Sequence, residues 1–158
     1  MNSTSGGEGD VLIVRLAISA SQERLFDAWT TPAQLREWWG PAGVSCTAAE
    51  VDLRVGGRYR IANRLPDGKT LWIAGEFERI ERPTLLVYSW RLETEPGANT
   101  ASERVTVRFV PQGDTTEVVV THERIATRAM KEQHEQGWVG CLAGLKRYLS
   151  TSNGRIES

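Results

Sequence analysis

The sequence predicts one α+β domain in which a curved antiparallel sheet of about seven strands wraps around a long C-terminal helix and leaves an apolar pocket between them. Three observations carry this prediction. The chain has 158 residues, 40% hydrophobic and 25% charged, which suits a single packed core. The middle of the chain shows short runs of alternating apolar and polar residues between turn signals. The last long segment changes to a helical period.

One strand and two short helices are expected before the rest of the sheet. The run 11–18 is rich in β-formers but lacks clean alternation, which predicts a strand covered on both sides for part of its length. A short amphipathic helix follows a serine cap and stops at Thr31-Pro32. Thr31 with Gln34 forms a capping-box pattern and Pro32 suits a first helical position, so a second short helix is expected to run to Trp39.

Six further strands are expected between Thr47 and Glu123, separated by turns such as Gly56-Gly57, Pro66-Asp67-Gly68 and Gln112-Gly113-Asp114. The predicted strands are 49–55, 58–64, 70–80, 85–92, 103–110 and 115–122. The order is therefore β-α-α-β6-α once the final helix is added.

The final helix is predicted over 127–149, with its apolar side facing the dry side of the sheet. Gly137, Cys141 and Gly144 form a strip of small side chains on it, although glycine in a helix costs roughly 0.5–1 kcal/mol relative to alanine. The strip either lets the helix approach the sheet closely or leaves room for a ligand, and the sequence leaves both open. Residues 1–10 are expected to be a disordered tail and 151–158 a polar tail, flanking a domain at 11–150.

Composition and motif spacing exclude several classes of function. A net charge of −1 and a pI of about 6.2 argue against a nucleic-acid partner, and no apolar run is long enough for a membrane span. Cys46 and Cys141 lack paired spacing, so reduced thiols and a cytoplasmic location are expected. No metal is expected, because the cysteines and the two histidines fall in no ligand spacing. No cofactor is expected either, because phosphate-loop and dinucleotide motifs are absent.

Aromatic residues and one histidine are the candidate ligand contacts. Consecutive helical residues point about 100° apart, so Trp39 is expected at the pocket mouth and Trp38 toward the surface. His122 follows Val118 and Val120 on the dry face, either as a polar anchor or as a neutral histidine with a buried partner. His134 is expected to be solvated. The predicted ligand-binding residues are Trp39, Tyr59, Phe77, Trp90, His122 and Trp138, and no catalytic residue is assigned.

Five segments carry a resemblance to a known family. In chain order they are AISASQERLFDAWTTPAQLREWWGP, DLRVGGRYR, PDGKTLWIAGEFERIERPTLLVYSW, VTVRFVPQGDTTEVVVTHE and GWVGCLAGLKRYL. Together they resemble single-domain proteins similar to the heat-shock-protein-90 ATPase activator, within the SRPBCC superfamily of START-like, polyketide-cyclase and birch-pollen-allergen-like proteins. The likeness covers about 11–149 and implies a helix-grip fold.

The resemblance implies less about activity. Superfamily members bind lipids, hormones and polyketides, and some cyclise or hydrolyse them, but no shared catalytic set can be placed here. The activator has an additional N-terminal domain that residues 1–10 are not expected to supply, so its co-chaperone role is not carried over.

Three function hypotheses follow from the sequence. The leading one is binding of a small hydrophobic or aromatic molecule. The first alternative is a cyclase- or hydrolase-type enzyme with His122 as acid or base. The second is a protein-interaction or chaperone-regulatory module that uses an exposed Trp38 or a sheet edge, for example as a homodimer.

Overall fold

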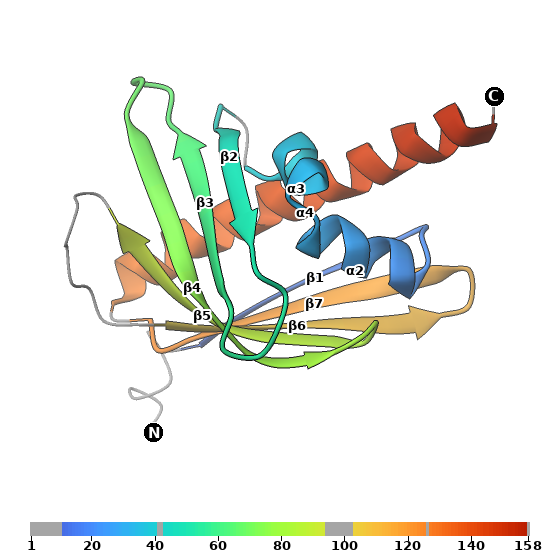
Figure 1. Ribbon diagram of the computed structural model, residues 1–158, viewed down its shortest axis with the longest axis horizontal. Coiled ribbons are helices and arrows are strands. Elements are labelled where there is room, and N and C mark those ends of the chain that lie inside the picture. The colour runs from blue at the N-terminus through green and yellow to red at the C-terminus, as the bar shows by residue number, and fades with distance from the viewer. Residues whose placement is uncertain (1–10, 41–42, 94–102, 126, 158) are drawn as a thin grey trace.

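Seven antiparallel strands form one sheet in the order β1-β7-β6-β5-β4-β3-β2 in the computed structural model (Figure 1). The structure describes residues 11–40, 43–93, 103–125 and 127–157. The strands are β1 (Val11–Ile18), β2 (Ser45–Val51), β3 (Arg58–Arg64), β4 (Thr70–Glu81), β5 (Leu85–Glu93), β6 (Glu103–Gln112) and β7 (Thr115–Glu123). The helices are α2 (Gln22–Thr30), α3 (Pro32–Trp38) and α4 (Arg128–Glu157). This arrangement confirms the predicted element order and the helix-grip fold.

The sheet bends sharply across the middle of β4 and β5, so that β2, β3 and the first part of β4 stand away from the layer that contains β1, β6 and β7 (Figure 1). A Cβ added to Gly75 on β4 would lie 1.9 Å from the carbonyl oxygen of Ser89 on β5, so only glycine fits where the two strands approach. A register shift between Phe77 and Arg79 adds to the bend, as β-bulges do. The result is a deeply concave inner face.

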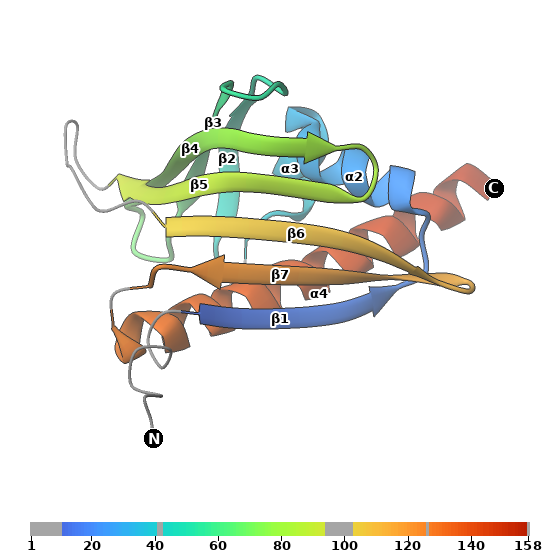
Figure 2. The same ribbon diagram turned by 90° about the horizontal axis from the view of Figure 1, so that it is seen from below.

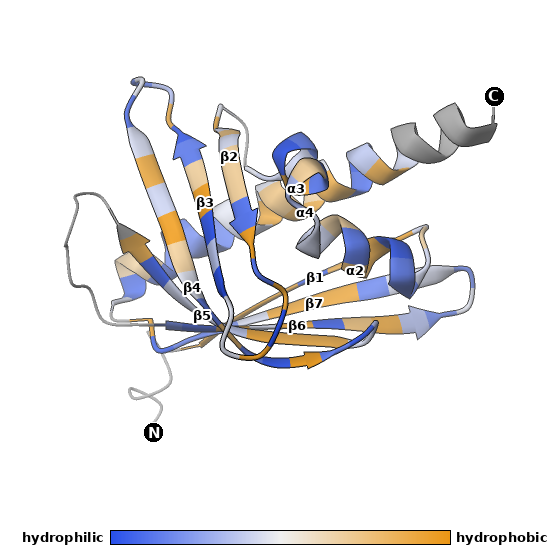
Figure 3. Cartoon of the chain, viewed as in Figure 1, coloured by the Kyte–Doolittle hydropathy of each residue, from blue (hydrophilic) through white to orange (hydrophobic). Residues whose placement is uncertain are grey.

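Helix α4 runs along this concave face, as the view from below shows (Figure 2). Its buried side chains meet the inward residues of the strands, where hydrophobic residues recur at alternate positions along β4 (Figure 3). Buried residues of α4 are Trp138, Cys141, Leu142, Leu145 and Leu149. The core therefore lies between α4 and the sheet, with α2 and α3 beside it.

Strand β1 is covered on one face only, contrary to the expectation of cover on both sides. Leu12 and Val14 are buried, whereas Ile13 between them is 50% exposed. The reason is that β1 is an edge strand, paired only with β7 and contacted by α4 on its inner face.

The two adjacent tryptophans at the end of α3 are both buried, so the expectation that Trp38 faces the surface is wrong. Trp38 is 3% exposed and Trp39 is 6% exposed. The helix ends at Trp38 and Trp39 has extended backbone angles (φ −69°, ψ 139°), so the helical spacing of side chains does not apply to this pair. Pro32 begins α3 as predicted, but Thr31 makes no side-chain capping hydrogen bond.

Helix α4 continues to Glu157, beyond the predicted end at Leu149. Polar residues alone do not stop a helix, and no proline follows Leu149 in the sequence. The predicted tail at residues 1–10 lies outside the described residues. None of the helices in the described part of the chain is both long enough and apolar enough to cross a bilayer. Cys46 and Cys141 are buried free thiols.

Candidate functional site

A cavity of about 210 Å³ lies between α4 and the inner face of β3, β4 and β5. We call it the outer cavity. Indole rings form much of its wall, from Trp39, Trp90 and Trp138, and strand residues such as Leu71 and Ile73 add aliphatic surface. Polar side chains are few, which is the usual character of a small-molecule pocket. Those that line it are Asn63, Gln133 and His134.

A second, inner cavity of about 20 Å³ lies deeper in the sheet and shares Trp39 and Trp90 with the first. Tyr59, Phe77 and Tyr88 also line it. A space of this size holds about one water molecule, so it is too small for an organic ligand by itself. The Tyr59 hydroxyl donates a hydrogen bond to the carbonyl oxygen of Ser89 (2.6 Å), which holds this ring in the wall.

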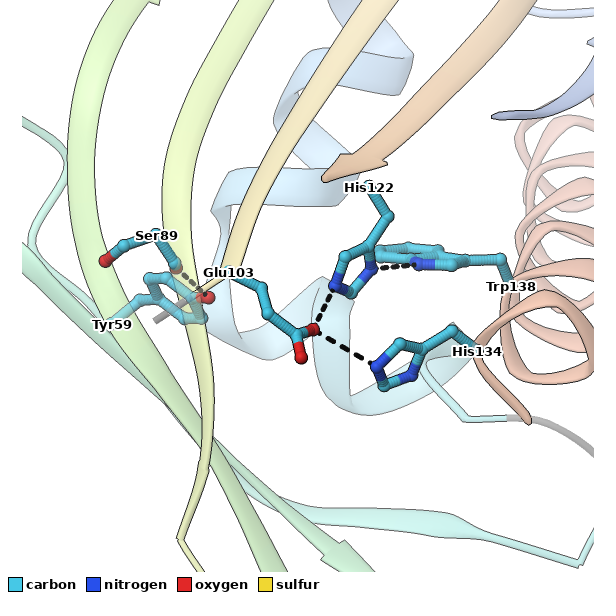
Figure 4. A network of polar contacts seen from close by, with 6 residues as sticks. All are labelled: Tyr59, Ser89, Glu103, His122, His134 and Trp138. Atoms are coloured by element: carbon cyan, nitrogen blue, oxygen red, sulfur yellow. Dashed lines mark hydrogen bonds and ion pairs between the residues drawn. The ribbon is translucent and has the colours of Figure 1, made fainter. Parts of the chain in front are cut away.

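A network of polar side chains lies beside the outer cavity (Figure 4). The Glu103 carboxylate is 2.6 Å from Nε2 of His122 and 3.1 Å from Nε2 of His134, both measured to Oε1. The indole Nε1–H of Trp138 donates to Nδ1 of His122 at 3.0 Å. Three elements therefore contribute: β6 carries Glu103, β7 carries His122, and α4 carries His134 and Trp138.

The Trp138 contact determines the tautomer of His122. An indole N–H can only donate, so Nδ1 of His122 must present its lone pair and the ring proton must reside on Nε2. That proton then points at Glu103, which accepts it. Burial lowers the pKa of His122, and although the hydrogen bond to Glu103 opposes this effect, burial outweighs it. His122 is therefore a neutral imidazole with both nitrogens engaged.

Glu103 remains ionised in this buried position. Burial by itself raises the pKa of the carboxyl group, but hydrogen bonds from His122 and His134 outweigh it and lower the pKa to about 2. Donors that stabilise a carboxylate in this way fix its negative charge in place. The network thus carries one buried negative charge next to the outer cavity.

Comparison with known proteins places the chain in a family. Residues 19–150 match the family described as "Activator of Hsp90 ATPase homolog 1-like protein". The chain belongs to this family. The resemblance stated from the sequence is thereby confirmed. Among curated proteins, none matches the chain.

Several solved structures share the fold of this chain. The AHSA1 protein from Silicibacter pomeroyi superposes with a TM-score of 0.81 at 22% identity, over 90% of this chain and 99% of that one. A protein from Chromobacterium violaceum gives 0.78 at 22% identity, over 87% and 96%. DynU16, described as a putative protein in the dynemicin biosynthetic locus, gives 0.74 at 18% identity, over 90% of this chain but 48% of that one. At these identities the likeness shows the fold alone.

The six predicted ligand-binding residues fall into three groups according to the cavity that they line. Trp39, Trp90 and Trp138 line the outer cavity. Tyr59 and Phe77 line only the inner cavity. His122 is fully buried and lines neither cavity; it lies against Trp90, with ring centroids 5.0 Å apart.

The structure corrects the expectation for His134. Its side chain is 12% exposed and lines the outer cavity, stacked on His122 with ring centroids 4.5 Å apart. A sequence signal existed: His134 precedes Trp138 by four residues, so the two share a helix face. Glu103 carries a comparable signal, because it has the same parity as Val105 along β6 and therefore faces inward. It is not among the predicted site residues.

The two glycines of the α4 strip turn out to have different roles. A Cβ at Gly144 would lie 2.8 Å from the carbonyl oxygen of Trp38, so this glycine allows close packing of α4 on the end of α3. A Cβ at Gly137 would meet no atom within 4 Å, and this residue lines the outer cavity. Close packing therefore explains Gly144, whereas Gly137 borders open space.

The network has the residue types of a metal site, because ligand atoms of Glu103, His122 and His134 lie within 4.8 Å of one another. The tautomer argues against this role. Metal binding by Nε2 of His122 needs a lone pair there, but the Trp138 contact places the proton on that nitrogen. Cys141 is also a poor nucleophile, since burial raises the pKa of its thiol to about 12.

Proposed function

We propose that this protein binds one small, largely apolar molecule containing an aromatic ring in the outer cavity. The observation that carries the proposal is a space of about 210 Å³ walled by three indole rings and aliphatic side chains. An apolar cavity of about 150 Å³ is sufficient to take up benzene. The outer cavity therefore has room for one or two fused rings.

The helix-grip fold supports this proposal because it explains why the space exists. The outer cavity lies between the bent sheet and α4, and Gly137 borders it without a side chain that would fill it. The rings of the wall are also held in place: Trp39 donates to Asn63 (2.9 Å), and Asn63 is itself anchored on backbone carbonyls of Ile61 and Leu71. A preformed wall of this kind lowers the ordering cost of binding.

Gly137→Leu tests the proposal by filling the cavity from the helix. The new side chain enters open space, so the protein should fold while ligand binding is lost. Freshly purified wild-type protein is first examined by native mass spectrometry for a retained small molecule, and one- and two-ring aromatics are then titrated by calorimetry. Val139→Leu is the control, because Val139 is exposed on the same helix. Unchanged binding by Gly137→Leu would overturn the proposal.

One observation supports an enzymatic alternative, with His134 in place of His122. His134 lines the cavity, and its Nε2 contacts the Glu103 carboxylate, which leaves Nδ1 as the nitrogen able to exchange a proton with a bound molecule. His122 cannot take this role while both of its nitrogens are engaged. If the protein turns over a ligand, His134→Ala should abolish turnover and retain binding, whereas a change in affinity alone supports a binding protein.

The protein-interaction alternative loses its basis at Trp38. That side chain is buried and donates a hydrogen bond to the carbonyl oxygen of Ala28 (2.8 Å), so it offers no exposed contact surface.

A further inference from the structure

The hydrogen-bonding pattern of the core tryptophans has one exception. Four indole N–H groups each have an acceptor: Trp29 donates to the Tyr88 hydroxyl, Trp38 to Ala28, Trp39 to Asn63 and Trp138 to His122. Trp90 is 6% exposed, and its buried Nε1–H has no acceptor among the residues that the structure describes. Buried donors without an acceptor are rare in folded proteins, because such a group has lost its water and gained nothing in return.

The surroundings of Trp90 restrict where an acceptor can come from. Its neighbouring rings are those of His122, Trp138, His134 and Trp39, at centroid distances of 5.0, 5.4, 6.1 and 6.3 Å. Nδ1 of His122 already accepts from Trp138, and Oε1 of Glu103 contacts both histidines. Nδ1 of His134 and Oε2 of Glu103 are further acceptors in this region, but among the described residues neither accepts from Nε1 of Trp90. Trp90 lines both cavities, so a molecule in the outer cavity contacts this ring. Nε1 itself is covered by neighbouring atoms, so a hydrogen bond to the molecule requires a small rotation of the indole in the cavity wall.

We infer that the ligand of this protein carries a neutral oxygen acceptor, such as a ketone, quinone or ester carbonyl, which accepts a hydrogen bond from Nε1–H of Trp90. The inference rests on the proposed function and defines its ligand class more narrowly. A carbonyl on an aromatic ring system supplies both the apolar surface that the wall needs and the missing acceptor. A carboxylate is disfavoured, because it would place a second buried negative charge close to that of Glu103.

The test compares two probes that differ in the acceptor alone, 1-tetralone and tetralin, by calorimetric titration of the wild type and of Trp90→Phe. Phenylalanine keeps an aromatic ring and removes the donor. We expect the substitution to weaken the binding of 1-tetralone by at least about 5-fold more than that of tetralin, which is the lower end of the range for a buried acceptor left unpaired. The ratio of the two losses isolates the hydrogen bond from the change in ring size.

Trp39→Phe is the matched control. It also replaces an indole of the cavity wall, but the N–H that it removes is donated to Asn63 and not to the ligand. The affinity for both probes should therefore decrease by the same factor. A naphthoate probe tests the charge argument, and it should bind more weakly than 1-tetralone.

A second measurement does not depend on a variant. In the wild type, the indole proton resonance of Trp90 should move downfield on titration with 1-tetralone and stay in place, or move upfield by ring current, with tetralin. Equal losses for both probes in Trp90→Phe, with no downfield shift, would overturn the inference and leave the proposed function standing. If neither probe bound the wild type, the proposed function would fail and this inference with it.

Discussion

The chain of contacts from Trp138 through His122 and Glu103 to His134 shows how one donor-only group sets the state of its neighbours. Because the indole can only donate, His122 is held as the neutral tautomer that donates to Glu103. The carboxylate then keeps its charge although it is buried. The acid–base state of this part of the core therefore depends on Trp138, a residue with no titratable group.

Acid should destabilise the fold in two steps. Burial lowers the pKa of His122 below its ordinary 6.5, so below about that pH the unfolded chain binds a proton that the folded chain does not. The pKa of Glu103 falls from 4.5 to about 2, so its contribution to stability is lost as the pH decreases through that range. Urea unfolding between pH 8 and pH 3 measures both. His122→Gln should show a smaller loss of stability between pH 7 and pH 5, and an unchanged slope there would contradict this assignment.

Trp138→Phe should destabilise the protein by about 1–3 kcal/mol, because it leaves Nδ1 of His122 buried without a donor. The same change frees Nδ1 to accept a proton, so the pKa of His122 should rise. Urea denaturation and an NMR titration of His122 measure the two effects. Trp29→Phe is the comparison, since Trp29 donates to the Tyr88 hydroxyl and makes no contact with His122 among the described interactions. A pKa of His122 that rises equally in both variants would count against the tautomer argument.

At the scale of single elements, α4 performs two tasks on one face. Near Gly144 it packs against the backbone at the end of α3, and near Gly137 it leaves room beside the indole rings. Residue size along the helix therefore decides where the core is filled and where it is open. The end of α3 also shapes the core. Because the helix stops at Trp38, both adjacent tryptophans are buried.

Alanine at these two glycines should have opposite effects on stability. Gly137→Ala adds a methyl group into open space and removes the cost of glycine in a helix, so the free energy of unfolding should increase by about 0.5–1 kcal/mol. Gly144→Ala drives a methyl group against the Trp38 carbonyl and should decrease it by about 1–3 kcal/mol. Chemical denaturation of the pair is the measurement. Equal changes of either sign would show that the two positions do not differ as described.

At the scale of the whole molecule, ligand binding should be visible as thermal stabilisation. A ligand that binds only the folded state at 100 times its Kd adds about 2.7 kcal/mol. For a domain of this size that corresponds to an increase in Tm of about 5–10 °C. A suitable one- or two-ring ketone should produce this shift in the wild type and none in Gly137→Leu. A shift of the same size in both would place binding outside the outer cavity.

The sequence was sufficient to predict the fold, because the period-two pattern assigns strand faces and the turn residues separate the strands. The same pattern placed His122 and Trp90 inward, and the helical period placed Trp138 on the buried side of α4. The helical period failed at the end of α3, where Trp39 has an extended backbone and Trp38 is buried instead of facing the surface. His134 was expected to be solvated, as polar residues usually are, although its spacing from Trp138 places it on the same helix face. Glu103 was not among the predicted site residues, although it shares the inward parity of Val105. Which of the inward residues face a cavity and which face each other depends on the bend at Gly75, which no periodicity encodes.

The clustering of the aromatic core also has a spectroscopic consequence. Five of the six indoles, from Trp29 to Trp138, form a continuous series of neighbours with centroids 5.0–6.3 Å apart. Excitation energy is transferred readily between chromophores at such separations. A quencher that contacts one of these indoles should therefore decrease the fluorescence of all five. Trp72 is not part of this series among the described ring contacts and lies beneath the guanidinium of Arg60. Its fluorescence should therefore persist. A molecule entering the outer cavity should therefore extinguish most of the native fluorescence while a residual signal persists.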